Sequence, residues 1–176
     1  MIRTLATMSP NIAVRRSEPA QLDELVLLWL ALHHHHQATT TSVPIVRDDE
    51  LSWQRRRAWY ERMIDHEHGF VVVARAADKP VGYAFVRVHE GPDDTLDFGV
   101  RWGQVVTLSV LPAYRGAGVG TSIMDEVDRQ LAAIGVHSVE IDVMQGNDRA
   151  REFYERRGYV LGQVYLFKVG STGDQS

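Results

Sequence analysis

The sequence contains no cysteine among its 176 residues. This absence excludes a disulfide scaffold, a thiolate zinc site, an iron–sulfur cluster and a cysteine nucleophile. Long apolar runs are also missing, because the most apolar stretch, residues 25–32, has only eight residues where a membrane span needs ~20. The first eleven residues have one arginine and no apolar core of the kind found in signal peptides. We therefore expect a soluble, cytoplasmic protein with no membrane partner.

An excess of positive charge is absent as well. Lys and Arg number 19 against 23 Asp and Glu, which gives a net charge of −4. A general polyanion-binding surface is therefore disfavoured, and we expect no nucleic-acid partner. Hydrophobic residues make up 44% of the chain and charged residues 24%, which is ordinary for a globular domain. The length fits one domain.

The spacing of apolar residues predicts a single α/β domain over residues 1–170, followed by a polar, disordered tail at residues 171–176. Helices are expected from residue 18 or 19, over residues 48–66, after Gly120, and over residues 147–157. The expected strands cover residues 12–16, 70–74, 81–88, 104–110, 138–143 and 159–169. The second and third of these strands should form a hairpin across an Asp-Lys-Pro turn.

A glycine-rich loop at residues 115–120 (RGAGVG) separates the strand at 104–110 from a helix. Glycine lets the backbone turn tightly and approach a ligand closely. The N-terminus of a helix offers unpaired N–H groups and a partial positive charge, which suit phosphate. The loop therefore predicts a cradle for a diphosphate, with Arg115 as an additional cation. The alternative is a glycine-rich turn that binds nothing.

Two nucleotide-binding motifs compete for this loop. A P-loop fails because no lysine follows the glycines. A dinucleotide-binding GxGxxG motif fits at Gly116 and Gly118 but has Thr121 at its third position, while Asp142 lies about where a ribose-binding acid is expected. A nucleotide-dependent oxidoreductase therefore stays open as an alternative, although the hairpin before the loop disfavours it.

Two motifs together resemble the GNAT family of N-acetyltransferases. The first is Arg115-x-x-Gly118-x-Gly120, directly after a strand, which is similar to the family's [Q/R]-x-x-G-x-[G/A] signature. The second runs over residues 147–159 (NDRAREFYERRGY) and is similar to the family's N-x-x-A-x-x-[FY]-Y-x-x-x-G-[FY] segment. The resemblance covers roughly residues 70–169.

The resemblance implies a single-domain GNAT fold, with a mixed central sheet of about six to seven strands and about four flanking helices. It also implies that acetyl-CoA binds between the strands at 104–110 and 138–143, without a metal. In the family, one central strand pairs with the cofactor arm, the glycine loop holds the diphosphate, and the second motif contacts the arm. The implied cofactor-binding residues are Leu108, Val110, Arg115, Gly116, Ala117, Gly118, Val119, Gly120, Thr121, Asn147, Ala150 and Phe153.

The implied reaction is direct attack of a neutral primary amine, from a small molecule or a peptide, on the thioester in a ternary complex. A backbone N–H of the strand at 104–110 would stabilise the oxyanion. Tyr154 would lie near the sulfur and act as general acid toward the leaving thiolate. A core aromatic role is the alternative for Tyr154.

The general base is where this sequence departs from the family. Many relatives carry a carboxylate on the strand before the loop, but Gln104 and Thr107 stand at the corresponding positions here, and neither accepts a proton at neutral pH. A water chain, a histidine, or a loop carboxylate such as Glu90, Asp94 or Asp97 would have to replace it. The missing carboxylate keeps a non-catalytic acyl-CoA-binding or regulatory module open as an alternative function.

A run of four histidines at residues 33–36 is internal to the chain. His33 and His36 stand at i, i+3, a spacing that can bind metal, but no carboxylate stands at matching spacing. A solvated helix end is a second interpretation, and lining of the acceptor site a third. The last assigns His33 and His36, together with Asp97, to binding of a cationic amine. The resemblance is also compatible with a homodimer.

Overall fold

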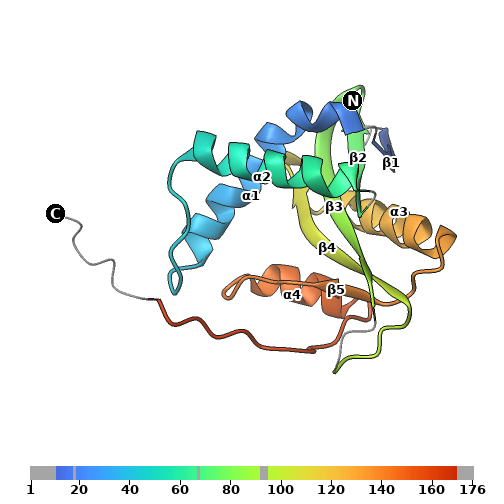
Figure 1. Ribbon diagram of the computed structural model, residues 1–176. Helices are drawn as coiled ribbons and strands as arrows, with labels where there is room; N and C mark the ends of the chain where they lie inside the picture. Colours follow the sequence, from blue (N-terminus) through green and yellow to red (C-terminus); the bar gives the residue numbers. More distant parts are fainter. Residues whose placement is uncertain (1–10, 18, 67, 92–94, 170–176) are drawn as a thin grey trace, which may run out of the picture.

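The computed structural model describes residues 11–17, 19–66, 68–91 and 95–169 (Figure 1). Within these ranges the chain forms five strands, four α-helices and two short 3-10 segments. In chain order the elements are β1 (Ile12–Arg16), η1 (Pro19–Leu25), α1 (Val26–Thr39), α2 (Asp49–Asp65), β2 (Gly69–Ala76), β3 (Lys79–Glu90), β4 (Arg101–Val110), η2 (Pro112–Tyr114), α3 (Val119–Ala133), β5 (Val139–Ile141) and α4 (Asp148–Glu155).

The five strands form one mixed sheet in the order β1-β2-β3-β4-β5. The first three pairings are antiparallel, and β2 and β3 form the expected hairpin. Only β4 and β5 run parallel. The α/β mixed sheet is thus confirmed, whereas the expected number of six to seven strands is wrong for the described part of the chain. A sheet with one parallel pair also differs from the doubly wound parallel sheet that a dinucleotide-binding oxidoreductase needs.

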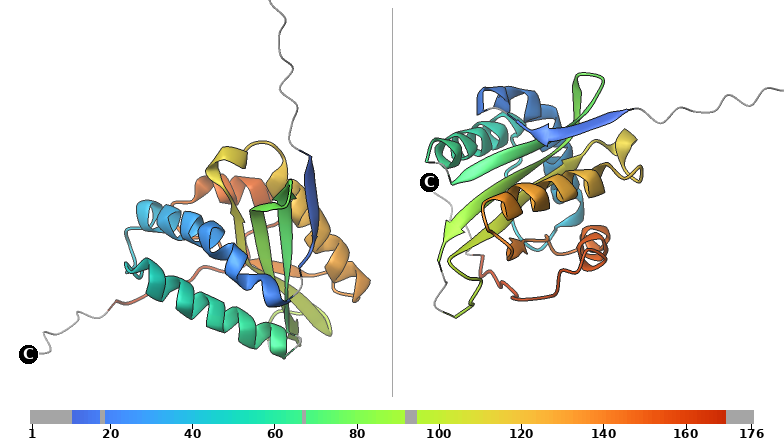
Figure 2. Two further views of the ribbon diagram at one scale, coloured as in Figure 1. Left: turned by 90° about the horizontal axis from the view of Figure 1, so that it is seen from above. Right: turned by 90° about the vertical axis from the view of Figure 1, so that its right-hand side faces the viewer.

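Helices cover both faces of the sheet (Figure 2). On one face α1 and α2 pack through a buried aromatic cluster that includes Trp29, Tyr60 and Phe85. On the other face α3 presents Ile123 and Leu131, from its apolar stripe, to the strands. Side chains along β3 and β4 point alternately into these two cores, as expected for a sheet buried on both sides.

The expected strand at residues 159–169 is absent from the structure. The chain after α4 is extended and runs away from the rest of the protein (Figure 1). Its residues have strand-like composition, but a strand also needs a partner for its main-chain hydrogen bonds. No strand within the described ranges supplies that partner, so this prediction is wrong for the single chain.

The structure also differs from the expectations for the N-terminal helices. The histidine run belongs to α1, which extends to Thr39, so the helix is longer than its apolar spacing indicates. The first helical segment begins as the 3-10 turn η1 rather than as α-helix. The tail expected at residues 171–176 lies outside the described residues. None of the helices in the described ranges is long and apolar enough to cross a membrane.

Candidate active site

Strands β4 and β5 pair over only three residues each. Gly103, Gln104 and Val105 face Val139, Glu140 and Ile141 in register. Beyond Val105, β4 continues to Val110, and no strand in the described ranges pairs with this side of it. We call residues 106–110 on this side the unpaired edge of β4. Such an edge offers main-chain donors and acceptors to an extended ligand.

The main-chain groups of Leu108 and Val110 lie on the unpaired edge. The N–H of Leu111 donates to the carbonyl of Val81 on β3, and main-chain groups alternate between the two sides of a strand. Val110 and Leu108 are therefore turned away from β3. The one-residue bulge between the β3–β4 pairs Phe85–Thr107 and Val86–Val105 produces this direction, because it shifts the alternation along β4.

The glycine loop reaches α3 through two left-handed residues. Gly116 has φ of 80° and Gly118, the N-cap of α3, has φ of 82°, and nothing lies within 4 Å of a Cβ built on either. A side chain at either position would be strained whatever the space. The first main-chain bond of α3 runs from Ser122 N–H to the Gly118 carbonyl, so the N–H groups of residues 119–121 have no acceptor within the helix.

No acidic residue in the first turn of α3 compensates these N–H groups. Instead, two guanidinium groups lie nearby. Arg115 donates from Nε to the carbonyl of Val110 over 2.9 Å, which fixes it at the end of the unpaired edge. Burial lowers the pKa of Arg115, and the charge of Arg149 on α4 lowers it further. Two cations beside an uncompensated helix N-terminus form a site for an anion.

The second motif lies against the first. A Cβ built on Gly120 would stand 3.8 Å from Phe153 and 3.9 Å from Val110, so α3, α4 and the end of β4 meet at this point. Asn147, which the resemblance assigns to the cofactor arm, caps α4 by accepting from Ala150 N–H with its side-chain oxygen over 3.3 Å. Ala150 and Phe153 pack against the core on the α3 face.

Tyr154 lies in the wall of the α3-side core with 7% of its surface exposed. Its ring contacts those of Phe153 and Tyr159, with centroids 5.1 and 5.5 Å away. Burial raises the pKa of Tyr154, the neighbouring Tyr159 phenol raises it further, and the charge of Arg157 opposes both. The phenol is therefore protonated at neutral pH. Its hydroxyl makes no hydrogen bond with a residue that the structure describes, so it is available as a donor.

The opposite face of the sheet is closed by the end of α1. Thr40 donates through its hydroxyl to the carbonyl of Gln145 over 3.2 Å, and Ser42 donates to the Gln145 side-chain oxygen over 3.0 Å. A Cβ built on Gly146 would stand 2.9 Å from the Thr39 carbonyl. These contacts join α1 to the loop that follows β5. The α1 face therefore borders the region where β4 and β5 separate.

The four histidines of α1 have different environments. His33 is 4% exposed, stacks on Trp29 and lies 3.0 Å from the Gln37 amide. His34 pairs with Asp49 at 2.9 Å and ties α1 to α2. Burial lowers the pKa of His36 to about 4, and the neighbouring His35, His33 and Arg56 contribute in the same direction. His36 is therefore neutral at neutral pH.

The structure favours some interpretations of the histidine run over others. No group of three or more metal-ligating side chains forms within the described residues, so the metal interpretation gains no support. Neither His33 nor His36 is a fully solvated helix end, because His33 is buried and His36 is partly buried. His36, in the last turn of α1, lies closer to the contacts with Gln145 than His33 does along the helix.

A polar chain that the sequence did not reveal joins β3, β4 and the residue directly after β5. Gln104 on β4 accepts from His89 Nε2 over 3.1 Å and donates to Asp142 over 3.3 Å. His89 stacks on Trp102 with ring centroids 3.9 Å apart, and burial is the main cause that lowers the pKa of His89. Val105 belongs to the α3-side core, so its neighbour Gln104 points to the α1 face. We call His89, Gln104 and Asp142 the polar chain.

The remaining base candidates are placed as follows. Thr107 is 3% exposed and its hydroxyl lies 2.6 Å from that of Tyr60, so it is part of the core. Asp97 is exposed and accepts from Gly99 N–H over 3.1 Å in the loop before β4. Glu90 is exposed at the end of β3, and Asp94 lies outside the described residues. Asp142 directly follows the last β5 residue that pairs with β4.

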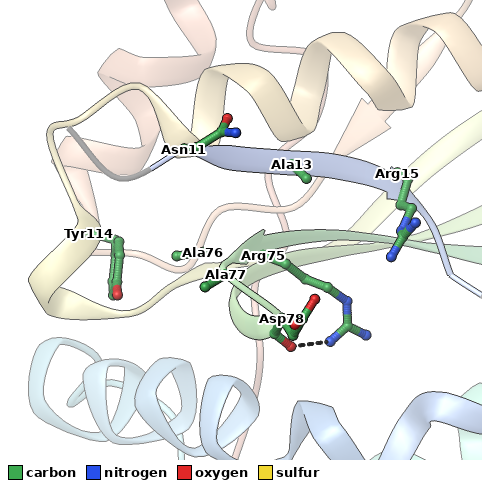
Figure 3. A pocket seen from close by; sticks show the side chains of 8 residues that line it. All are labelled: Asn11, Ala13, Arg15, Arg75, Ala76, Ala77, Asp78 and Tyr114. Carbon is green, nitrogen blue, oxygen red and sulfur yellow. Dashed lines mark hydrogen bonds between the residues drawn. The ribbon is translucent and has the colours of Figure 1, made fainter. Parts of the chain in front are cut away.

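A surface hollow lies elsewhere on the protein (Figure 3). It is formed by β1 and by the β2–β3 turn, where Arg75 donates to the Asp78 carbonyl over 3.1 Å. Tyr114 of η2 lies at its side. None of its lining residues belongs to residues 106–110, so this hollow is separate from the unpaired edge of β4.

Comparison with known proteins relates this geometry to a family. Residues 29–159 match the family described as "Acetyltransferase (GNAT) family". A mycothiol acetyltransferase from Frankia alni (strain DSM 45986 / CECT 9034 / ACN14a) is 30% identical over 147 residues, which make up 82% of this chain and 41% of that relative. The chain thus spans about two fifths of the length of that curated relative.

Solved structures share the fold at low sequence identity. The aminoglycoside N-acetyltransferase AAC(6')-Iy in complex with CoA has a TM-score of 0.71 and 17% identity, with 95% of this chain and 99% of that chain covered. A predicted acetyltransferase with acetyl-CoA from Clostridium acetobutylicum has a TM-score of 0.67 and 13% identity, with 90% and 96% covered. The family match includes both motifs, the unpaired edge of β4 and Tyr154. This chain belongs to the GNAT family of acetyltransferases.

Proposed function

We propose that this protein is an N-acetyltransferase that moves the acetyl group of acetyl-CoA to a primary amine of a small molecule or peptide. The observation that carries the proposal is the meeting of β4, α3 and α4 at Gly120, which puts the unpaired edge and the uncompensated α3 N-terminus side by side. Similar proteins that are named acetyltransferases or were solved with CoA support acetyl-CoA as the acetyl donor. AAC(6')-Iy in complex with CoA is one of them. Acetyl-CoA supplies the activated acetyl thioester.

The chain's own groups fit that donor. The N–H groups of residues 119–121, with Arg115 and Arg149, suit a diphosphate. The main-chain groups of Leu108 and the N–H of Val110 suit the amides of the pantetheine arm, since the Val110 carbonyl already accepts from Arg115. One N–H of the unpaired edge would stabilise the oxyanion of the tetrahedral intermediate.

Tyr154 is proposed as the general acid. It is protonated at neutral pH because burial raises its pKa, and a protonated phenol can donate to the thiolate that leaves. The raised pKa makes the phenol a weaker acid, so its part is a hydrogen bond that strengthens as negative charge develops on sulfur.

The acceptor amine is proposed to approach from the α1 face, where the polar chain lies. The Asp142 carboxylate, oriented by Gln104, would attract and orient a cationic amine. His89 is neutral at neutral pH because its pKa is lowered. Since its Nε2–H donates to Gln104, Nδ1 keeps a free lone pair that can take the amine proton. We propose a small-molecule or peptide acceptor and no nucleic acid.

The proposal is tested with a panel of amines and acetyl-CoA. An aminoglycoside such as sisomicin, a polyamine, an amino acid and an N-terminal peptide are incubated with the protein, and free CoA is measured with a thiol reagent. The protein adds no thiol signal because it has no cysteine. We expect CoA release above simple hydrolysis with at least one amine.

A binding measurement separates the enzyme from a non-catalytic module. Acetyl-CoA at a hundred times its Kd should stabilise the fold by about 2.7 kcal/mol, and NAD(P) should not. Stabilisation by acetyl-CoA without CoA release across a broad amine panel would favour the acyl-CoA-binding module. Absence of any stabilisation by acetyl-CoA would refute the proposal.

A further inference from the structure

Three consecutive arginines on α2 have different surroundings. Arg55 is exposed. Arg57 pairs with Asp23 over 2.7 Å and with Glu61 over 2.9 Å. Arg56 is partly buried, and no carboxylate within the described ranges forms an ion pair with it. Unlike the charge of Arg57, the charge of Arg56 is therefore not compensated by an acid of the fold.

Aromatic rings hold the Arg56 guanidinium between α1 and α2. Its central carbon lies 4.3 Å from the centre of the Trp29 ring, 5.6 Å from that of Tyr60 and 5.8 Å from that of Trp59. The Trp29 ring is itself fixed, because its N–H donates to the Ser52 hydroxyl over 3.1 Å. Rings of this kind attract a guanidinium without neutralising it, so its N–H groups can still donate to an anion.

The histidines that face Arg56 supply no negative charge. Burial is the main cause that lowers the pKa of His33 and of His36, and the charge of Arg56 adds to it at both. Both imidazoles are therefore neutral at neutral pH. Asp49 also acts on His33, but its carboxylate is paired with His34 over 2.9 Å. The charge of Arg56 is thus available to an anionic group of a ligand.

Hydroxyl groups connect Arg56 to β4. Tyr60, whose ring lies beside Arg56, has its hydroxyl 2.6 Å from that of Thr107. Thr107 stands three residues after Gln104 of the polar chain, which is roughly 10 Å along a strand. Arg56 therefore borders the α1 face on which the amine is proposed to bind, at a distance from Asp142.

We propose that Arg56 binds a carboxylate of the acceptor, and that the acceptor is a primary amine whose carboxylate lies roughly 10 Å from the nitrogen. A guanidinium binds a carboxylate through two parallel N–H···O bonds, so it can fix one end of an extended substrate. Asp142 attracts the amine at the other end. The inference rests on the proposed function for the place of the amine.

This spacing selects among the amines. An α-amino acid is too short, because its amine and carboxylate share one carbon atom. A tripeptide, at ~3.5 Å per residue, has the required length, and so has a long ω-amino acid. Aminoglycosides and polyamines have no carboxylate for Arg56, so they are expected to be poorer acceptors.

Binding of matched ligands tests the inference without turnover. Triglycine and triglycinamide differ in whether the C-terminus is charged, and each is titrated into the protein by calorimetry in the presence of CoA, which carries no acetyl group. We expect triglycine to bind ~10-fold or more tightly than triglycinamide, the scale of hydrogen bonds to a charged group. The pair of 8-aminooctanoate and its amide should show the same preference. Equal affinities within both pairs, or no measurable binding of either carboxylate, would overturn the proposal.

Variants of the arginine run assign the preference to one side chain. Arg56→Gln should remove the difference between triglycine and triglycinamide, whereas Arg55→Gln is the matched control and should keep it. Arg56→Lys retains the charge without the planar pair of donors, so a smaller difference is expected. If Arg56 only supported the packing of the rings, Arg56→Gln would weaken both peptides alike and keep the difference, which contradicts the proposal. Loss of acetyl-CoA affinity with the difference kept would assign Arg56 to the cofactor and also contradict it.

Turnover is measured separately, so that the two proposals can fail independently. At subsaturating concentrations, CoA release from acetyl-CoA should be faster with triglycine than with triglycinamide. If triglycine binds through Arg56 but no amine releases CoA, the N-acetyltransferase proposal fails and the carboxylate site stands. If amines release CoA but the carboxylates bind no better than their amides, the carboxylate site fails and the N-acetyltransferase proposal stands.

Discussion

The two faces of the sheet contribute different kinds of chemical group to the proposed site. On the α3 face, the site consists mainly of main-chain groups, glycines and a helix N-terminus within residues 106–121, to which α4 adds Arg149 and Tyr154. On the α1 face, the polar side chains come from separate elements: His36 from α1, His89 from β3, Gln104 from β4 and Asp142 after β5. Most groups on the α3 face lie in one continuous stretch of the sequence, whereas the groups on the α1 face come together only once the sheet has formed.

The difference also separates two kinds of specificity. Main-chain donors and a helix dipole recognise a diphosphate whatever the side chains nearby, so a fixed co-substrate suits them. Side chains drawn from several elements can change independently, and they suit a variable acceptor. We therefore expect substitutions on the α3 face to change acetyl-CoA binding or kcat, and those on the α1 face to change kinetics toward the amine.

The largest effect is expected for Tyr154→Phe. Loss of the phenol removes the donor to the leaving thiolate, so kcat should fall by ~10²-fold while acetyl-CoA affinity stays near the wild-type value. Steady-state kinetics and calorimetry measure the two quantities. Tyr159→Phe is the matched control, because its ring packs on Tyr154 and its loss of a hydroxyl should leave kcat largely intact. Wild-type turnover in Tyr154→Phe would rule out the acid role.

A smaller effect is expected for Asp142→Asn on the other face. Removing the carboxylate should lower kcat/KM for the amine by about tenfold, the scale of one hydrogen bond to a charged group. The Kd of acetyl-CoA should not change. Asp97→Asn, measured beside it, tests the acid that the sequence suggested for the amine. A loss in Asp97→Asn without a loss in Asp142→Asn would move the acceptor site to the loop before β4.

The smallest effect is a pH dependence of stability from His36. Its pKa is lowered to about 4 by burial, while an unfolded histidine titrates near ~6.5. The stability that it contributes is fully present above ~6.5 and is lost as pH falls toward 4, because only the unfolded chain takes up the proton.

His36→Gln should therefore flatten the stability curve. Between pH 7 and pH 5, the wild type should lose about 1 kcal/mol more than the variant, after allowance for solvent screening. Urea unfolding at the two pH values measures this difference. His137→Gln, at an exposed position, is the control and should follow the wild type. Parallel curves for His36→Gln and wild type would show that His36 is not held neutral by the fold.

The sequence predicts the groups of the α3 face better than those of the α1 face. The glycine loop, the hairpin and the Asn147–Tyr159 segment are local, so their patterns predict both structure and place. Arg149 was missed although it lies inside the second motif, because a motif specifies spacing and not charge at its variable positions. The chain of His89, Gln104 and Asp142 was missed because strand pairing across 15 and 38 residues creates it.

The segment after α4 shows another limit of prediction from the sequence. Its composition predicts a strand, and the structure of one chain shows none at residues 160–169. The sequence indicates that a segment can form a β-strand, but it does not indicate whether another strand is available to pair with it.

The most direct test of the central claim compares acetyl-CoA with S-acetylpantetheine, which lacks the diphosphate and the nucleotide. Calorimetry is carried out on the wild type and on Arg115→Gln combined with Arg149→Gln. If the diphosphate is held by these two cations and the N-terminus of α3, the double variant should lose acetyl-CoA affinity by ~10–100-fold and keep its affinity for S-acetylpantetheine. Equal acetyl-CoA affinity in the two proteins would contradict the assignment of the glycine loop.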